Sequence, residues 1–185
     1  PARSAFVVGH GALAEALRHK WPHSSGDIAV FAGPARELFL FAHSRAADLD
    51  AGRLGILAVT EMGGHHGIDR AVHPEQGGTT GLAKALAAEF PKAWVRALDL
   101  DAEEDIAPRV RHADAELKVD RSLVEVGRNA KGRIVVRTIE AGTTDTKIPT
   151  LAPHSVILVT GGARGITAEI LKALAPQKPI LILLG

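Results

Sequence analysis

The segment from Val156 to Thr167 constrains the fold of this chain more than any other. Four apolar residues and Thr160 run into a glycine-rich sequence, Gly161 to Gly165, and a helix is predicted over 168–175. A strand, a glycine turn and a helix in this order open a dinucleotide-binding fold, because the glycines let backbone N–H groups and the helix N-terminus approach a pyrophosphate. The cation of Arg164 lies inside the turn, where it is placed to reach the 2′-phosphate of NADP. We therefore expect a nucleotide-binding turn here.

The nucleotide-binding turn lies close to the end of the sequence. Only 18 residues follow Thr167, with space for one helix and a last apolar strand over 179–184. A complete nucleotide-binding domain needs several more strand–helix units. We expect the chain to carry the opening of a cofactor site without its remainder, and both of its ends to be cut from a larger polypeptide.

Upstream of this turn, apolar strands alternate with helical segments. Strands are expected over 5–8, 28–32, 54–60 and 94–100, and a short apolar run over 37–42 reads as another strand. Helices are expected over 12–20, 45–53 and 81–90, and a further helix is expected to begin at Asp101. This alternation predicts a mostly parallel α/β sheet of Rossmann type.

The pattern changes after Val119. Segments 123–126 and 133–139 flank the polar stretch 127–132, which predicts a β-hairpin. A segment rich in Gly, Thr and Pro follows and predicts a linker over 141–153. We expect one domain over 1–140, and the first β-α-β unit of a second Rossmann fold over 154–185.

The composition excludes several classes of protein. The 22 basic and 21 acidic residues give a net charge of +1, and aromatic residues make up only 4%. These values argue against a nucleic-acid partner and against an anionic membrane surface. The chain has no cysteine, which fits a cytoplasmic location, and its N-terminus does not resemble a signal peptide.

A second glycine pattern, Gly9-x-Gly11-x-x-Ala14, follows the first strand. Taken alone it matches a dinucleotide fingerprint, whose acidic residue lies about 20 residues further on. The next strand ends at Ala32-Gly33-Pro34 without a carboxylate. We expect this turn to bind no nucleotide, and a stand-alone binding module remains as an alternative.

In this order, the two turns resemble the ketoreductase region of type I polyketide and polyunsaturated fatty acid synthases, in the short-chain dehydrogenase/reductase superfamily. The likeness extends over nearly the whole chain. It is carried by the segments 82–91 (LAKALAAEFP), 96–101 (RALDLD), 124–128 (VEVGR), 134–137 (IVVR) and 159–169 (VTGGARGITAE).

The resemblance implies an NADPH-dependent β-ketoacyl reductase acting on substrates held by an acyl carrier protein. In that family a truncated structural subdomain braces a catalytic subdomain. The resemblance places the cofactor against Thr160, Gly161, Gly162, Arg164, Gly165 and Ile166.

The catalytic residues of the family lie beyond the first two strands of the catalytic subdomain, and this chain contains no tyrosine. We therefore assign it no catalytic residue. Its expected partners are the remainder of the catalytic subdomain, the carrier-bound substrate and, through an exposed apolar edge over 180–184, a second copy of the chain. One chain of a two-chain reductase is the main alternative.

Other candidate groups are weaker. The nine histidines, including the adjacent pair His65-His66, do not have metal-ligand spacing. Glu61 and Asp69 are the only carboxylates that suggest an acid/base pair, and nothing in the sequence brings them together. Lys84 follows Thr80 at the spacing where active reductases place Tyr and Lys, and we expect it to be a surface charge.

Overall fold

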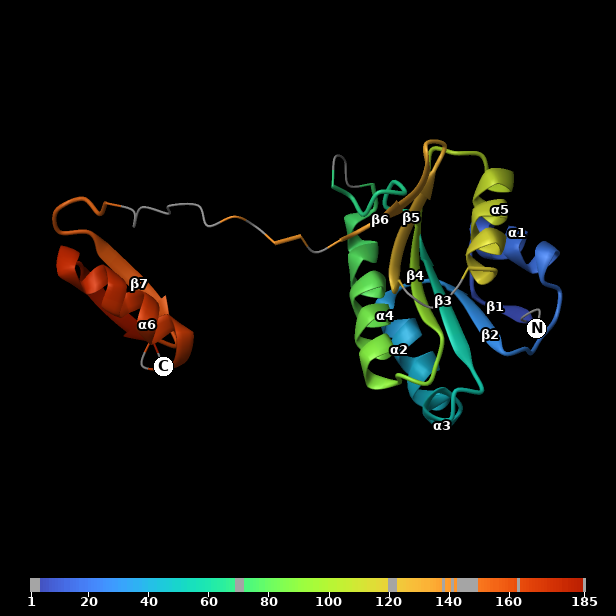
Figure 1. The fold of residues 1–185 in the computed structure, drawn as a ribbon, viewed down its shortest axis with the longest axis horizontal. Helices are drawn as coiled ribbons and strands as arrows, with labels where there is room; N and C mark the ends of the chain where they lie inside the picture. Colours follow the sequence, from blue (N-terminus) through green and yellow to red (C-terminus); the bar gives the residue numbers. More distant parts are fainter. Residues whose placement is uncertain are drawn as a thin grey trace. The chain divides into compact units, whose positions relative to one another are not determined.

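The computed structural model describes residues 4–68, 72–119, 123–137, 139–140, 142, 150–162 and 164–184. The chain forms two compact units, Pro1–Thr138 and Ile139–Gly185, which are described separately below (Figure 1). Asp69, one of the two carboxylates considered above, lies outside the described residues.

The first unit is built on a six-stranded sheet. Its strands are β1 (Ala5–Gly9), β2 (Ile28–Ala32), β3 (Gly55–Thr60), β4 (Val95–Leu100), β5 (Glu125–Asn129) and β6 (Gly132–Val135). They lie in the sheet in the same order as in the sequence. Strands β1 to β5 are parallel, and β6 returns antiparallel to β5. The predicted mostly parallel α/β fold is confirmed.

Helices cover both faces of this sheet (Figure 1). They are α1 (Ala12–Lys20), α2 (Ala35–Ser44), α3 (Ala46–Asp50), α4 (Gly77–Glu89) and α5 (Ile106–Leu117). A 3₁₀ turn, η1 (Pro74–Gln76), precedes α4. Residues of α2, α3 and α4 pack on one face, and residues of α1 and α5 pack on the other. Because both faces are covered, β2, β3 and β4 are buried at every position. β2 and β3 read in the sequence as apolar runs, whereas β4 also buries the charged residues Arg96 and Asp99.

Three sequence predictions are wrong in detail. Residues 37–42 belong to helix α2, in which Leu38 and Ala42 are buried while Phe39 and Leu40 are exposed. An apolar run of this length is compatible with either a strand or a helix. The two buried residues, Leu38 and Ala42, are four positions apart, which is the spacing of one helix face. Helix α5 begins at Ile106 rather than Asp101, and the hairpin turn is shorter than predicted, since β5 reaches Asn129 and β6 begins at Gly132.

The second unit contains one β-α-β arrangement. Strands β7 (Val156–Thr160) and β8 (Ile180–Leu184) are parallel and joined by α6 (Gly165–Leu174) and a 3₁₀ turn, η2 (Ala175–Gln177). Within the described residues β8 pairs only with β7, so its other edge is open. Several aliphatic side chains of this unit are exposed, among them Val156, Leu158, Ile166, Ile170, Ile180, Ile182, Leu183 and Leu184.

Candidate functional site

The glycine turn of the second unit lies between β7 and α6, as the sequence predicts. Thr160 is the last residue of β7 and is paired with Leu184 of β8. The N–H of Gly161 donates to the Leu184 carbonyl at 2.8 Å, which fixes the start of the turn to the end of β8. The turn therefore lies at the carboxyl end of both parallel strands, the edge at which α/β folds bind their ligands.

The turn contains two glycines whose backbone is left-handed and one arginine, Arg164, whose backbone is extended. Gly161 and Gly165 both have φ of +67°, a conformation that side chains other than glycine rarely adopt. A Cβ placed on either glycine meets no atom within 4 Å, so the backbone here is open to an approaching group. Gly162 differs, because it is buried and a Cβ on it would lie 2.8 Å from Leu183 Cδ2. The two open glycines suit contact with a ligand, and Gly162 suits close packing.

The remaining predicted residues are accessible. Arg164 precedes the first residue of α6 with extended backbone, and its side chain is exposed. Ile166, in the first turn of α6, is 81% exposed. Thr160 is also exposed. The structure thus places the six predicted residues between the end of β7 and the first turn of the ten-residue helix α6, and all of them except Gly162 are exposed.

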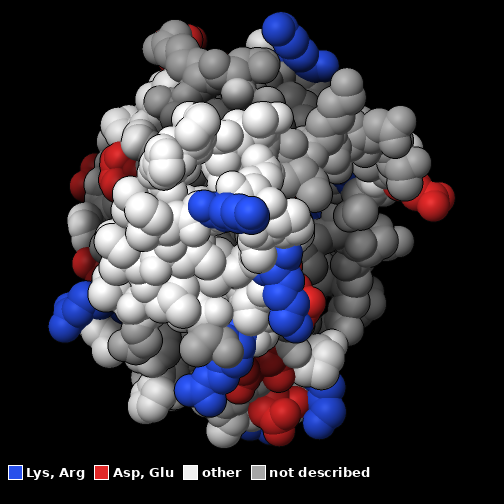
Figure 2. Space-filling view, turned by 90° about the vertical axis from the view of Figure 1, so that its left-hand side faces the viewer, with Lys and Arg blue, Asp and Glu red and all other residues white. Residues whose placement is uncertain are grey.

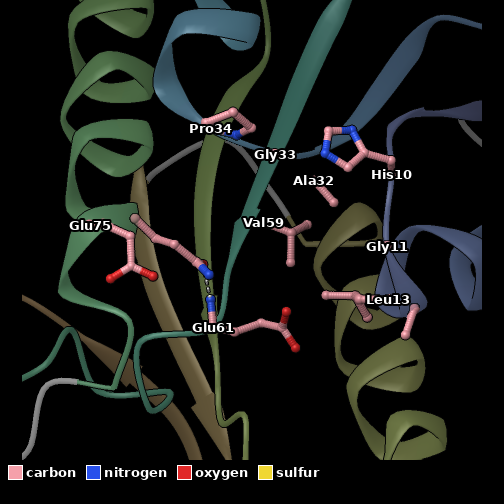
Figure 3. A pocket seen from close by; sticks show the side chains of 11 residues that line it. His10, Gly11, Leu13, Ala32, Gly33, Pro34, Val59, Glu61 and Glu75 are labelled. Atoms are coloured by element: carbon pink, nitrogen blue, oxygen red, sulfur yellow. Dashed lines mark hydrogen bonds between the residues drawn. The ribbon is translucent and has the colours of Figure 1, made fainter.

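The glycine pattern of the first unit borders a cavity of about 280 Å³ (Figure 3). Strand β1 continues into α1 on one face of the sheet and β2 continues into α2 on the other, so a crevice opens between their carboxyl ends. Gly9 packs so closely on β2 that a Cβ would lie 1.8 Å from the Ala32 carbonyl oxygen, whereas Gly11 faces open space. Gly9 is therefore explained by strand packing alone.

Carboxylates dominate the charge around this cavity. Glu61 and Glu75 line it, and Glu37 Oε2 lies 3.7 Å from Nδ1 of His10 at its edge. Figure 3 shows Glu61 below Val59, its backbone N–H bonded to Gln76 Oε1 at 2.7 Å. The Glu61 carboxylate is paired with Arg109, while Glu75 is paired with the imidazole of His73. Arg109 neutralises Glu61, and the carboxylates of Glu37 and Glu75, which have only histidine partners, disfavour a pyrophosphate.

A second polar cluster was not predicted from the sequence. Asp99 is buried in β4, and its Oδ1 accepts the Met62 N–H at 2.6 Å and the Thr60 hydroxyl at 3.2 Å. Its Oδ2 accepts the His66 N–H at 2.9 Å. Asp99 therefore fixes the loop that follows β3. The signal in the sequence was a carboxylate inside the strand 95–100, whose other residues are apolar except for Arg96.

The groups considered for other chemistry are occupied by structural contacts. Lys84 is an exposed surface charge, as predicted, and its Nζ lies 2.7 Å from Oε2 of Glu125. Among the described residues no three His, Cys, Asp or Glu side chains converge on a metal site. On the face drawn in Figure 2, uncharged side chains cover most of the surface and Lys and Arg are interspersed with Asp and Glu along the lower margin. Searched over the part of the chain that the structure describes, no helix is long and apolar enough to cross a membrane.

Comparison with known proteins gives structural matches only. No protein-family model matches the chain, and no curated protein matches its sequence. A ketoreductase from the first module of phoslactomycin biosynthesis in Streptomyces sp. HK803 matches with a TM-score of 0.64 and 22% identity, over 99% of this chain and 44% of that one. A C2-type ketoreductase from a modular polyketide synthase matches with a TM-score of 0.60 and 22% identity, over 92% of this chain and 40% of that one.

A third match is a multidomain structure with adenylation, ketoreductase and pseudo-Asub domains, from a keto acid-selecting NRPS module. Its TM-score is 0.63 at 17% identity, over 99% of this chain and 21% of that one. The chain thus spans less than half the length of each of these structures. The likeness shows that the α/β fold of ketoreductase structures extends through nearly the whole chain.

Proposed function

We propose that this chain is part of an NADPH-dependent β-ketoacyl reductase domain of a multidomain polyketide or fatty acid synthase. Its first unit, over 1–140, is the structural subdomain; 141–153 is a linker; and 154–185 opens the catalytic subdomain. The observation that carries the proposal is the ketoreductase likeness over 99% of the chain, which includes the exposed glycine turn after β7.

The turn has the features that a dinucleotide phosphate requires. The open backbone at Gly161 and Gly165 admits a pyrophosphate to the N-terminus of α6, where the helix dipole favours negative charge. The exposed Arg164 offers a guanidinium for the 2′-phosphate that distinguishes NADPH from NADH. NADPH supplies the hydride when it is bound. The residues of this chain hold and orient its phosphates.

The proton for the reduced oxygen has to come from elsewhere. Reduction of a β-keto group places negative charge on oxygen, and a positioned acid such as a tyrosine donates the proton. This chain contains no tyrosine. In our proposal the remainder of the catalytic subdomain provides that acid and binds the carrier-held substrate.

Binding measurements test the cofactor role directly. NADPH fluorescence titrations of the chain, alone and with the remainder of a ketoreductase catalytic subdomain added, should give saturable binding that the addition strengthens. Arg164→Ala should weaken NADPH binding about tenfold and NADH binding by less than about twofold, since only NADPH carries the 2′-phosphate. Arg36→Ala, an exposed arginine of α2, is the matched control. Equal losses for both cofactors would refute the role of Arg164.

A reductase assay tests the activity. With a β-ketoacyl thioester and NADPH, the chain alone should show no turnover, because it lacks the proton donor. Addition of the remainder should restore NADPH oxidation. Turnover by the purified chain alone would contradict the proposal.

The open edge of β8 favours one alternative, a reductase assembled from two chains. An unpaired, apolar strand edge invites pairing with another strand. Intact-mass analysis of the purified protein distinguishes this alternative from our proposal, because a two-chain enzyme requires a second polypeptide, which carries a Tyr-x-x-x-Lys motif. A stand-alone nucleotide module in the first unit is the other alternative, and the carboxylates of its cavity argue against it. Only that module predicts loss of binding in Gly11→Val and no effect in Gly161→Val.

A further inference from the structure

The first unit holds a second cavity, of about 370 Å³, on the face of the sheet that α2, α3 and α4 cover. Its lining residues come from two segments, 39–46 of α2 and α3 and 82–90 of α4 and its C-cap. Helices α2 and α4 lie side by side (Figure 1), so the cavity is a groove between them. Its volume falls within the range of small-molecule sites, about 300–1,000 Å³.

The walls of the α2–α4 groove are mainly apolar. Seven of its nine lining residues are Ala, Leu or Phe. Leu86 is 7% exposed, whereas Phe39 is 54% exposed and its ring stacks on that of His43 with the centroids 6.1 Å apart. The groove is thus open to solvent at Phe39 and reaches the core at Leu86. An apolar body placed in it would remove this surface from water, which is favourable.

The groove lies at two helix C-termini. Helix α2 lies between the parallel strands β2 and β3 in the sequence, and α4 lies between the parallel strands β3 and β4. Both helices therefore run back along the sheet in the same direction and end at the same edge. The lining residues include Ala42 and His43 from the last turn of α2, and Leu86 and Glu89 from the last turn of α4. Each helix end contributes about half a negative charge.

Glu89 adds a full negative charge at this position. Helices favour basic residues in their last turn, but α4 has none there and carries Glu89 instead. Glu89 is exposed, lines the groove and has no ion-pair partner among the described residues. With histidine counted as neutral, it is the only charged residue of the lining. A cation in the groove would therefore be stabilised by the carboxylate and by both helix ends.

Apolar walls and an unpaired negative charge together select one class of ligand. A hydrocarbon would leave the Glu89 charge unmatched, and an organic anion would be repelled by it. A metal ion is disfavoured, because no three His, Cys, Asp or Glu side chains of the described residues converge on a metal site. We propose that the α2–α4 groove binds a small organic cation, an ammonium group carried on a single aromatic or aliphatic ring.

Three probes with the same apolar body test this inference. Phenethylamine carries an ammonium group, 2-phenylethanol is uncharged and phenylacetate is an anion. Each is titrated at pH 7.5 into the ¹⁵N-labelled chain, and the backbone amides of Ala42, Ala46 and Ala85, which line the groove, are followed by NMR. Phenethylamine should bind saturably in the millimolar range and about tenfold more tightly than 2-phenylethanol, and phenylacetate should bind most weakly. Ethylamine, which has the charge without the ring, should not saturate.

Variants connect the binding to the named side chains. Glu89→Gln should weaken phenethylamine binding about tenfold and leave 2-phenylethanol binding unchanged, because it removes the charge alone. Glu15→Gln, at an exposed position of α1, is the matched control and should bind phenethylamine like the parent chain. Phe39→Ala should weaken both probes to a similar extent, and since Phe39 is exposed, the fold should tolerate the change.

Three results would overturn the inference. The first is equal affinity for phenethylamine and 2-phenylethanol, and the second is an equal loss in Glu89→Gln and Glu15→Gln. The third is a shift of the Ala42, Ala46 and Ala85 amides with protein concentration when no probe is present, because a second copy of the chain would then cover the groove.

Discussion

The carboxylate of Asp99 accepts the backbone N–H of His66 at 2.9 Å across 33 residues of sequence. The same carboxylate also accepts the N–H of Met62 and the hydroxyl of Thr60. The Asp99 side chain in β4 therefore provides the hydrogen-bond acceptors for the loop after β3 that a neighbouring strand provides within the sheet.

Replacement of Asp99 by Asn should loosen that loop. The amide retains one acceptor oxygen, but its NH₂ group turns toward backbone N–H groups that need an acceptor. We expect a loss of about 2 kcal/mol in unfolding free energy, measured by urea denaturation at neutral pH. Asp50→Asn, at the exposed end of α3, is the control and should change stability by less than about 0.5 kcal/mol. Equal stability of the two variants would contradict the role of Asp99.

Glu116 should make stability depend on pH. Its side chain is 0% exposed and accepts hydrogen bonds from Arg96 at 2.9 Å, Arg128 at 2.5 Å and Arg133 at 2.8 Å. Burial raises the pKa of this carboxyl, but the hydrogen bonds from Arg133 and Arg128 outweigh it, so its pKa lies below the usual 4.5. A lowered pKa stabilises the fold above the unfolded-state value, and this stabilisation is lost as pH falls through the lowered pKa.

Glu116→Gln should therefore lower the unfolding free energy at pH 7 by roughly 3 kcal/mol, since it leaves the buried Arg96 and the partly buried Arg128 and Arg133 without this counter-ion. The difference from the parent chain should narrow as the pH falls through the lowered pKa of Glu116, where the parent carboxylate also becomes protonated. Urea titrations at a series of pH values measure both effects. A difference that stays constant down to pH 2 would mean that the Glu116 charge is not the cause.

Gly162→Ala should destabilise the second unit. The added methyl group would lie 2.8 Å from Leu183 Cδ2, 2.9 Å from Val159 Cγ1 and 3.1 Å from Leu171 Cδ1, so these three side chains, on β8, β7 and α6, would have to shift. Overpacking of this kind costs about 1–3 kcal/mol. Hydrogen exchange of the α6 amides should report it, with Ala173→Val on the exposed face of α6 as control. Unchanged exchange in Gly162→Ala would mean that the turn has more space than this packing allows.

Ile182→Lys should reduce self-association. Ile182 is 46% exposed in β8, the strand whose second edge is open among the described residues. A charged side chain on such a strand opposes edge-to-edge pairing. Sedimentation velocity over a range of concentrations should show a smaller associated fraction for Ile182→Lys. Glu169→Lys makes a charge change on the exposed surface of α6 and should behave as the parent chain.

The sequence predicted the parallel sheet because buried strands such as 28–32 and 54–60 are short apolar runs that end in glycine or polar residues. It did not predict α2, because Leu38 to Phe41 is apolar throughout and only the tertiary fold decides that Leu38 and Ala42 face the sheet. Local pattern also predicted the glycine turn at Gly161. The cavity lined by His66, Thr80 and Glu125 was beyond prediction, since these residues are far apart in the sequence and come from a loop, a helix and a strand.

Each strand of the first unit lies beside the strand that precedes it in the sequence. During synthesis, each newly emerged strand can therefore pair with the strand that emerged before it, and no pairing requires a strand that is distant in the sequence. β2 is added to β1, β3 to β2 and so on, and each new helix arrives on a sheet surface that already exists. Such vectorial order lets this unit fold during synthesis, domain by domain from the N-terminus. In a longer polypeptide, this unit would then be folded before the segments that follow it are synthesised.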